Sequence, residues 1–170
     1  VLDPNRSVGV YVGHEAAVLT DLEQNEQTCC ADHMEEQLVP TGTWGEEFVL
    51  GLTQPRNDLA RGGAVAPDFI RILARADNTE LTITPPASGG CPVLNAGRHC
   101  DLFVTRNTRV TATEPILMAH FLLSTDGERG DPAMSFTPPV EQFRDDYTFL
   151  TPQEYQEDYI TVVAKVGGPV

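Results

Sequence analysis

The chain has 170 residues, which is enough for one domain with a substantial hydrophobic core. Its 25 Asp and Glu residues outnumber its 11 Lys and Arg residues, so the formal net charge is −14. A field of that sign argues against nucleic acid and anionic membranes as partners, and it favours solubility and contact with basic surfaces. Because 41% of the residues are hydrophobic and well distributed, the acidity does not predict disorder. No apolar run approaches the roughly 18 residues that a membrane span needs.

The chain begins with a pattern typical of a half-buried strand. Residues 7–12 place three valines on one face, namely Val8, Val10 and Val12. Residues 16–19 predict a second short strand, and the polar residues 20–28 predict an exposed loop.

Residues 32–38 predict a short helix. Asp32 can cap the helix start, and the two following glutamates would lie in the first turn, where carboxylates suit the positive helix end. Met34 and Leu38 are four residues apart and would share one face. A proline and a glycine then end the helix before Trp44. We interpret Trp44 as a core residue that packs beside a strand rather than as an exposed binding anchor.

The remainder of the chain predicts short strands separated by turns. Residues 53–67 form a long loop, which we interpret either as a binding loop or as simple disorder. Residues 68–76 predict the clearest core strand, and they are expected to form a hairpin with residues 80–84. Residues 116–123 are apolar on both faces except for His120, which predicts a central strand covered on both sides. Further strands are predicted at 46–52, 102–105, 109–112, 134–137, 147–151 and 159–165.

These elements favour an all-β fold over an α/β fold. About ten short strands with turn signals every 8 to 12 residues or so are typical of an antiparallel sandwich or a jelly-roll-like barrel. We expect residues 1–170 to form a single β domain, with one short helix near residues 32–38. We also expect this domain to be a fragment of a larger module, with neighbouring domains of the same precursor among its contacts.

Four cysteines lie in two clusters. Cys91 and Cys100 flank a loop that a local disulfide could close, and such a bond is worth roughly 2 to 3 kcal/mol in the chain-entropy model. Cys29 and Cys30 are adjacent and cannot easily pair with each other, so each has a distant partner or remains free. In a reducing compartment the same residues would be free thiols or metal ligands. The even count favours an oxidising, extracellular location.

One stretch suggests a metal site. His33, Glu36 and Gln37 nearly match the H-x-x-E-H pattern of a zinc-binding helix, but Gln37 replaces the second histidine ligand. His14, His99 or His120 could complete such a site. We favour capping and packing as the role of this stretch, and we keep a metal-dependent hydrolase centred on His33 as an alternative. We interpret His120 as a hydrogen-bonded core histidine.

A second acidic stretch lies near Asp131 and Pro132. Together with Asp126 and Glu128, Asp131 could hold a calcium ion, but the spacing is not that of a known calcium loop. We therefore interpret this stretch as a solvated loop and expect no cofactor. Residues 130–133 also resemble a Gly-Asp-Pro-His self-cleavage site, but Ala133 replaces the histidine, so we interpret Asp131 and Pro132 as a turn before the next strand. The sequence contains neither a nucleophile elbow nor a phosphate-binding glycine loop.

A series of short motifs in fixed order spans nearly the whole chain. The motifs are Gly13-His14-Glu15, Cys30-Ala31-Asp32-His33-Met34-Glu35-Glu36-Gln37-Leu38, Thr43-Trp44-Gly45, Ala76-Asp77-Asn78-Thr79, Leu94-Asn95-Ala96-Gly97, Gly130-Asp131-Pro132-Ala133-Met134, Pro139-Val140-Glu141-Gln142-Phe143 and Tyr147-Thr148-Phe149-Leu150-Thr151-Pro152. In these motifs the chain resembles the IgGFc-binding protein N-terminal domain family, and it looks like a bacterial-type member. It departs from the family at Ala16 and Ala17, where many members carry a cysteine, and this leaves the partner of Cys30 open.

The resemblance implies an extracellular or cell-surface module that binds rather than catalyses. Its ligand would be a protein of the immunoglobulin Fc type, another surface protein or a glycan. A purely structural domain of a large surface protein is the alternative that we keep beside this one.

Overall fold

The computed structural model describes residues 7–19, 31–58, 63–124, 131–151, 153 and 157–164. Over these residues the chain is all-β, with antiparallel strands, two short 3-10 turns and no α-helix. The strands are β1 (Tyr11–Ala17), β2 (Asp32–Gln37), β3 (Gly45–Leu50), β4 (Asn57–Asp58), β5 (Ala64–Val65), β6 (Asp68–Ala74), β7 (Leu81–Thr84), β8 (His99–Val104), β9 (Thr108–Leu122) and β10 (Ala133–Thr137), and the turns are η1 (Thr41–Thr43) and η2 (Val140–Gln142). The predicted all-β class is confirmed, and the described sheets do not close into a barrel.

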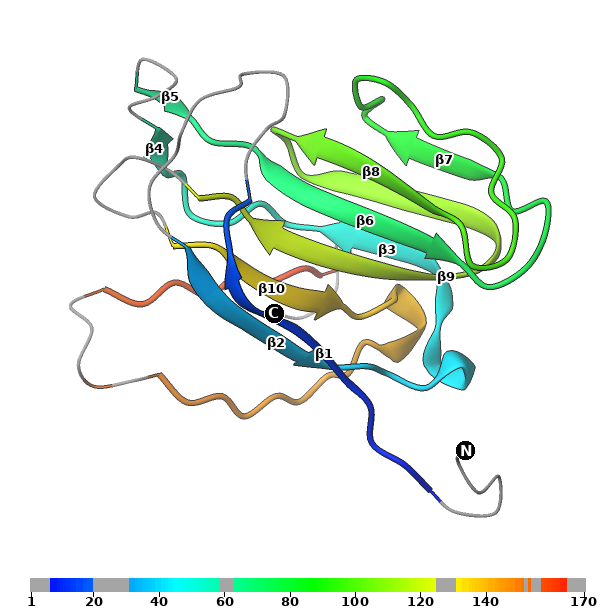
Figure 1. Ribbon diagram of the computed structural model, residues 1–170, viewed down its shortest axis with the longest axis horizontal. Helices are drawn as coiled ribbons and strands as arrows, with labels where there is room; N and C mark the ends of the chain where they lie inside the picture. Colours follow the sequence, from blue (N-terminus) through cyan, green and yellow to red (C-terminus); the bar gives the residue numbers. More distant parts are fainter. Residues whose placement is uncertain are drawn as a thin grey trace.

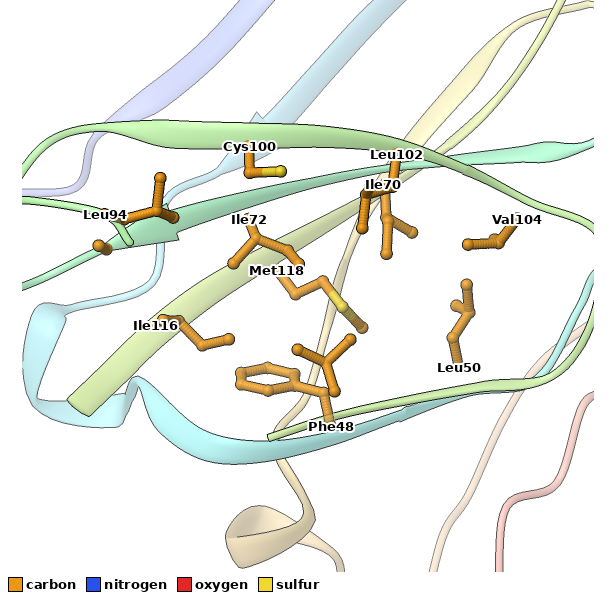
Figure 2. Close-up of a cluster of buried hydrophobic side chains, with 12 residues drawn as sticks. Phe48, Leu50, Ile70, Ile72, Leu94, Cys100, Leu102, Val104, Ile116 and Met118 are labelled. Carbon is orange, nitrogen blue, oxygen red and sulfur yellow. The ribbon is translucent and has the colours of Figure 1, made fainter. Parts of the chain in front are cut away.

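The long strand β9 joins two halves of a six-stranded sheet (Figure 1). Its first part, residues 108–112, pairs with β3 on one side and with β7 on the other. Its second part, residues 116–122, pairs with β6 and β10, and β6 continues to β8. The pairing with β3 shifts register between Gly45 and Glu47, next to the β9 segment that carries Pro115. β9 therefore bends between its two parts. The half-sheet of β3, β7 and residues 108–112 faces the half-sheet of β6, β8, β10 and residues 116–122 (Figure 2).

The main hydrophobic core lies between these two halves (Figure 2). Phe48 of β3 and Val110 of β9 face Ile70 and Ile72 of β6 and Met118 of β9, and all five side chains are at most 1% exposed. On β6 every second residue is buried, so the core strand predicted in this stretch is confirmed over residues 68–74.

A smaller core lies on the outer face of the half-sheet formed by β6, β8, β10 and the second part of β9. The hairpin formed by β1 and β2 packs there, and its Ala17 and Met34 contact Ala119 and Phe121 of β9. The second part of β9 is therefore covered on both faces, as the sequence predicted.

The predicted helix at residues 32–38 is wrong, because these residues form strand β2. They pair with β1 in register, with His14 opposite Met34 and Tyr11 opposite Gln37. The spacing of Met34 and Leu38 fits one face of a helix, but residues four apart also share one face of a strand. The pairing with β1 favours the strand over the helix, because it satisfies the hydrogen-bonding groups of the backbone along β2.

Other differences concern which strands pair. Residues 81–84 pair with β9 and not with residues 68–76, so the predicted hairpin is wrong. Residues 147–151 and 159–164 carry no strand, and Lys165 lies outside the described residues, as does the predicted loop at 20–28. Part of the predicted loop at 53–67 forms the short pair of β4 and β5.

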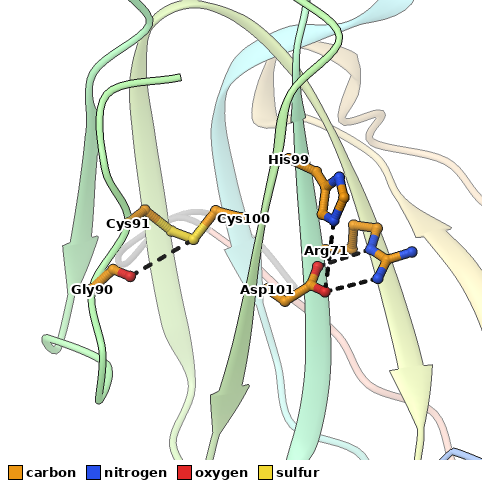
Figure 3. The surroundings of a disulfide bond; sticks show 6 residues. All are labelled: Arg71, Gly90, Cys91, His99, Cys100 and Asp101. Atoms are coloured by element: carbon orange, nitrogen blue, oxygen red, sulfur yellow. Dashed lines mark hydrogen bonds and ion pairs between the residues drawn. A yellow bond between two sulfur atoms is a disulfide. The ribbon is translucent and has the colours of Figure 1, made fainter. Parts of the chain in front are cut away.

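A disulfide joins Cys91 to Cys100 (Figure 3). Cys100 is a buried residue of β8 and pairs with Ile72 of β6, whereas Cys91 lies in the loop that follows β7. The bond therefore ties this loop to the edge of the half-sheet that contains β8. Cys29 and Cys30 lie outside the described residues, so their pairing stays a prediction.

Asp68 and His120 form a buried polar contact on the core side of β6 and β9. The Asp68 carboxylate lies 3.0 Å from His120 Nε2 and accepts hydrogen bonds from the backbone N–H and the hydroxyl of Thr53, at 2.9 and 2.8 Å. Burial alone would raise the pKa of Asp68, but the hydrogen bonds from His120 and Thr53 outweigh it and lower the pKa below its usual value. The structure thus gives His120 a hydrogen-bond partner within the core.

We predict that Cys91 and Cys100 are linked in the purified protein and stabilise it. Replacing both with serine should lower the free energy of unfolding by roughly 2 to 3 kcal/mol, because the unfolded chain gains entropy. Peptide mapping without reductant checks the bond, and urea unfolding checks the energy. Recovery of both residues as free thiols would contradict the assignment.

A further prediction concerns Asp68. The Asp68→Asn substitution should lower the free energy of unfolding at pH 7 by roughly 1 to 3 kcal/mol, because it disturbs a buried charged hydrogen-bond network. Since the folded-state pKa lies below the unfolded one, the carboxylate stabilises the fold at neutral pH, and that contribution is lost as the pH falls through the folded-state pKa. The difference in the free energy of unfolding between wild type and variant should therefore become smaller below about pH 4.

Urea unfolding from pH 7 down to pH 3 tests this dependence. Asp101→Asn is the matched control, because Asp101 is an exposed partner of Arg71 and its loss should change stability by less than about 1 kcal/mol. If the difference in unfolding free energy between wild type and Asp68→Asn stays constant with pH, the ionisation of Asp68 does not contribute to stability in this way.

Candidate binding site

Because residues 32–37 form strand β2 and not a helix, His33 and Glu36 are not arranged as in a zinc-binding helix. Successive side chains of a strand point to opposite faces, so His33 and Glu36 lie on opposite faces of the hairpin. His14 pairs with Met34 and therefore shares a face with Glu36 rather than with His33. The arrangement expected of a zinc helix is not assembled here. Within the described residues, no three His, Cys, Asp or Glu side chains lie close enough together to hold a metal ion.

Several of the motifs found in the sequence contact one another in pairs. Gly13, His14 and Glu15 lie on β1, directly beside the motif on β2. A side chain at Gly13 would meet the backbone carbonyl of Met34 at 2.5 Å, so only glycine fits this register. Asp32, Glu35 and Gln37 are exposed along β2. These motif residues hold the hairpin together or line its surface.

A second pair of motifs, residues 76–79 and 94–97, lies side by side just after the end of β6. Thr79 and Leu94 exchange two backbone hydrogen bonds of 2.8 and 2.9 Å. Asp77 accepts a hydrogen bond from the N–H of Ala96 at 3.0 Å, and Asn95 accepts one from the N–H of Asn78 at 3.3 Å. These residues serve as structural braces.

The third pair builds a surface feature around Trp44. The turn η1 follows β2 and holds Trp44 at the start of β3, while η2 follows β10. Glu141 of η2 accepts hydrogen bonds from the N–H groups of Glu46 and Glu47, at 3.0 and 3.3 Å. Gln142 donates to the carbonyl of Thr43. A side chain at Gly45 would overlap Pro139, so glycine is required where the two segments meet.

Trp44 is half-buried, and it lies between two hollows. Its indole Nε1 lies 3.5 Å from the carbonyl oxygen of Val39. One hollow is an apolar pocket of about 100 Å³, lined by Val39, Thr43, Trp44, Phe48, Ile116, Leu117, Phe136, Thr137, Pro138, Pro139 and Gln142. The other is wider and more polar, about 390 Å³, and is lined by Gly42, Thr43, Trp44, Gly45, Glu46, Pro115, Pro139, Glu141 and Gln142. We call these two hollows and Trp44 the Trp44 site.

The size and lining of the Trp44 site suit contact with another macromolecule. Pockets for small molecules and cofactors usually have several hundred Å³ and enclose most of the ligand. The wider hollow reaches this volume, but it is open to solvent and would not enclose a small ligand. The apolar pocket has room for about one side chain. A tryptophan in such a position is a common anchor of protein interfaces.

Sequence reasoning missed the partners of Trp44. The sequence predicts that Trp44 is a core residue, whereas in the structure Trp44 is only half-buried. Pro139, Glu141 and Gln142 belong to a sequence motif without an assigned role, and they lie about 95 residues after Trp44. The only available signal was the presence of two glycine- or proline-containing motifs with no assigned role.

The remaining predicted residues lie elsewhere or outside the described part. Asp131 is exposed and Pro132 is buried, and both lie directly before β10. Their role as a turn stays a prediction. Asp126 and Glu128 lie outside the described residues, so the calcium hypothesis stays untested. Among the described residues, no helix is long and apolar enough to cross a membrane.

Comparison with known proteins identifies the family to which the chain is similar. The family model described as IgGFc binding protein matches residues 1–170. No curated protein and no solved structure matches the chain. The match supports the family alone and does not support the narrower prediction of a bacterial-type member. The chain belongs to the IgGFc binding protein family.

Proposed function

We propose that this chain is a non-catalytic, extracellular binding module whose protein ligand docks on the Trp44 site. The family description points to a protein ligand. The Cys91–Cys100 disulfide fits an oxidising compartment outside the cell.

The observation that carries the proposal is the partial exposure of Trp44 between two hollows. A core tryptophan would be fully buried, but Trp44 is only half-buried and lines an apolar pocket of about 100 Å³. An incoming apolar side chain could fill the pocket, while backbone or basic groups of the ligand meet Glu46 and Glu141. Interfaces commonly combine one anchored aromatic residue with such a polar rim.

A purely structural domain is the second candidate. The observation in its favour is that the paired motifs brace the fold, and neighbouring domains could cover the Trp44 site. In that case the isolated chain would bind neither an Fc fragment nor a glycan.

We predict that Trp44→Ala weakens binding to an immobilised immunoglobulin Fc fragment by about 30-fold or more, which corresponds to the loss of a hot-spot residue of about 2 kcal/mol. Trp44→Phe should retain most of the affinity, because it keeps an aromatic anchor. Phe149→Ala is the matched control, since Phe149 is 64% exposed and lines neither hollow. Surface plasmon resonance gives the affinities, and thermal unfolding confirms that each variant folds.

Trp44 is the only tryptophan, so it is also a selective probe. In protein labelled with 5-fluorotryptophan, the single ¹⁹F resonance should shift when the Fc fragment binds. Binding without a shift, together with equal affinity for Trp44→Ala, would place the ligand elsewhere. Absence of binding to Fc and to an array of glycans would favour the structural candidate.

A further inference from the structure

The strand β1 has a free edge in the described part of the chain. Its only partner there is β2. The N–H of Leu38 donates to the carbonyl of Val10 at 2.8 Å, and this bond fixes which residues of β1 face β2. Because hydrogen-bonded and non-hydrogen-bonded pairs alternate in antiparallel strands, Val10, Val12 and His14 direct their backbone groups toward β2. The backbone groups of Gly9, Tyr11 and Gly13 then point away from it.

This edge is exposed and apolar. Val8, Val10 and Val12 are 55%, 45% and 42% exposed, and Tyr11 is 62% exposed. Alternating valines of this kind are typical of a strand that is covered on one face, which is what the sequence predicted. The fold instead covers only the far end of β1, where Ala17 is buried.

The hairpin around this edge is uniformly acidic. Glu15, Asp32, Glu35 and Glu36 are its carboxylates, and the sequence holds no Lys or Arg from Ser7 to Pro55. Among the described residues, none of these four carboxylates belongs to an ion pair; the ion pairs present involve Asp68, Asp101 and Glu47. Unpaired charges of one sign beside an apolar strand attract a partner of the opposite sign.

We propose that the free edge of β1 binds an extended, basic segment of a partner protein by strand addition. The backbone of that segment would pair with Gly9, Tyr11 and Gly13, and its apolar side chains would cover the exposed valines. Its Lys or Arg side chains would lie on the opposite face, which carries Glu35, the partner of Gly13. Charge argues against a second copy as occupant, because every copy carries the same acidic hairpin. The proposal rests on β1 and does not depend on the Trp44 site.

The probe is a fluorescent peptide of about seven alternating valine and lysine residues, since strands of this length are common. Its counterpart alternates valine with glutamate. Tyr11→Pro removes the outward N–H at the centre of the edge and leaves the bonds of Val10 and Val12 to β2 in place. Tyr11→Thr is the matched control, because it also removes the ring but keeps the N–H.

We expect the valine–lysine peptide to bind the full 170-residue chain, as measured by fluorescence anisotropy. Tyr11→Pro should weaken this binding by about tenfold or more, while Tyr11→Thr should change it by less than about threefold, since only the proline blocks pairing. The Glu35→Gln/Glu36→Gln double variant should weaken binding several-fold and reduce its dependence on salt. Amide exchange at Tyr11 should slow when the peptide is bound. Trp44→Ala should bind the peptide like wild type, which separates this site from the Trp44 site.

Several results would overturn the proposal. These are equal binding by Tyr11→Pro and wild type, equal binding of the valine–glutamate peptide, or no binding of the valine–lysine peptide at millimolar concentration. A dimer of the wild-type chain in sedimentation that Tyr11→Pro abolishes would show instead that a second copy occupies the edge. Circular dichroism of both Tyr11 variants establishes that the hairpin fold survives the substitution.

Discussion

The pairing of β9 with four other strands is the constraint on which the rest of the structure depends. Its first part holds β3 and β7, and its second part holds β6 and β10. The turn between the two parts brings Phe48 and Val110 opposite Ile70 and Met118, so one strand both builds the sheet and encloses the core. Any change that straightened β9 would separate these two layers, and the loss of the buried area between them would remove most of the hydrophobic stabilisation.

The motifs by which the family is recognised act here mainly in pairs. The motif on β1 requires glycine because the carbonyl of Met34 lies close to it, and the motif at the start of β3 requires glycine because Pro139 lies against it. Asp77 and Asn95 each bond the backbone of the other's segment. These constraints are internal to the fold, and they give these motif residues a structural role.

The sequence was sufficient for the fold class, because many short strands and turn signals follow one another along the chain. It was sufficient for the core strand β6, where apolar residues alternate, and for the two-sided burial of β9, where residues 116–123 are apolar on both faces. It failed at residues 32–38, where the spacing of Met34 and Leu38 fits a strand as well as a helix. It also failed at residues 81–84, since local turn signals say nothing about a partner strand that follows about 30 residues later. The Trp44 site could not be predicted, because half of it comes from η2, and only the folded chain brings η2 to Trp44.

The contact between η1 and η2 determines when the chain can form the proposed binding surface. Thr43 and Glu46 emerge early in synthesis, whereas Glu141 and Gln142 emerge after β10. The Trp44 site therefore cannot be complete until nearly all of the described strands have been made and paired. A nascent or partly unfolded chain would present Trp44 without its pocket, so a ligand that recognises the complete site selects for mature protein.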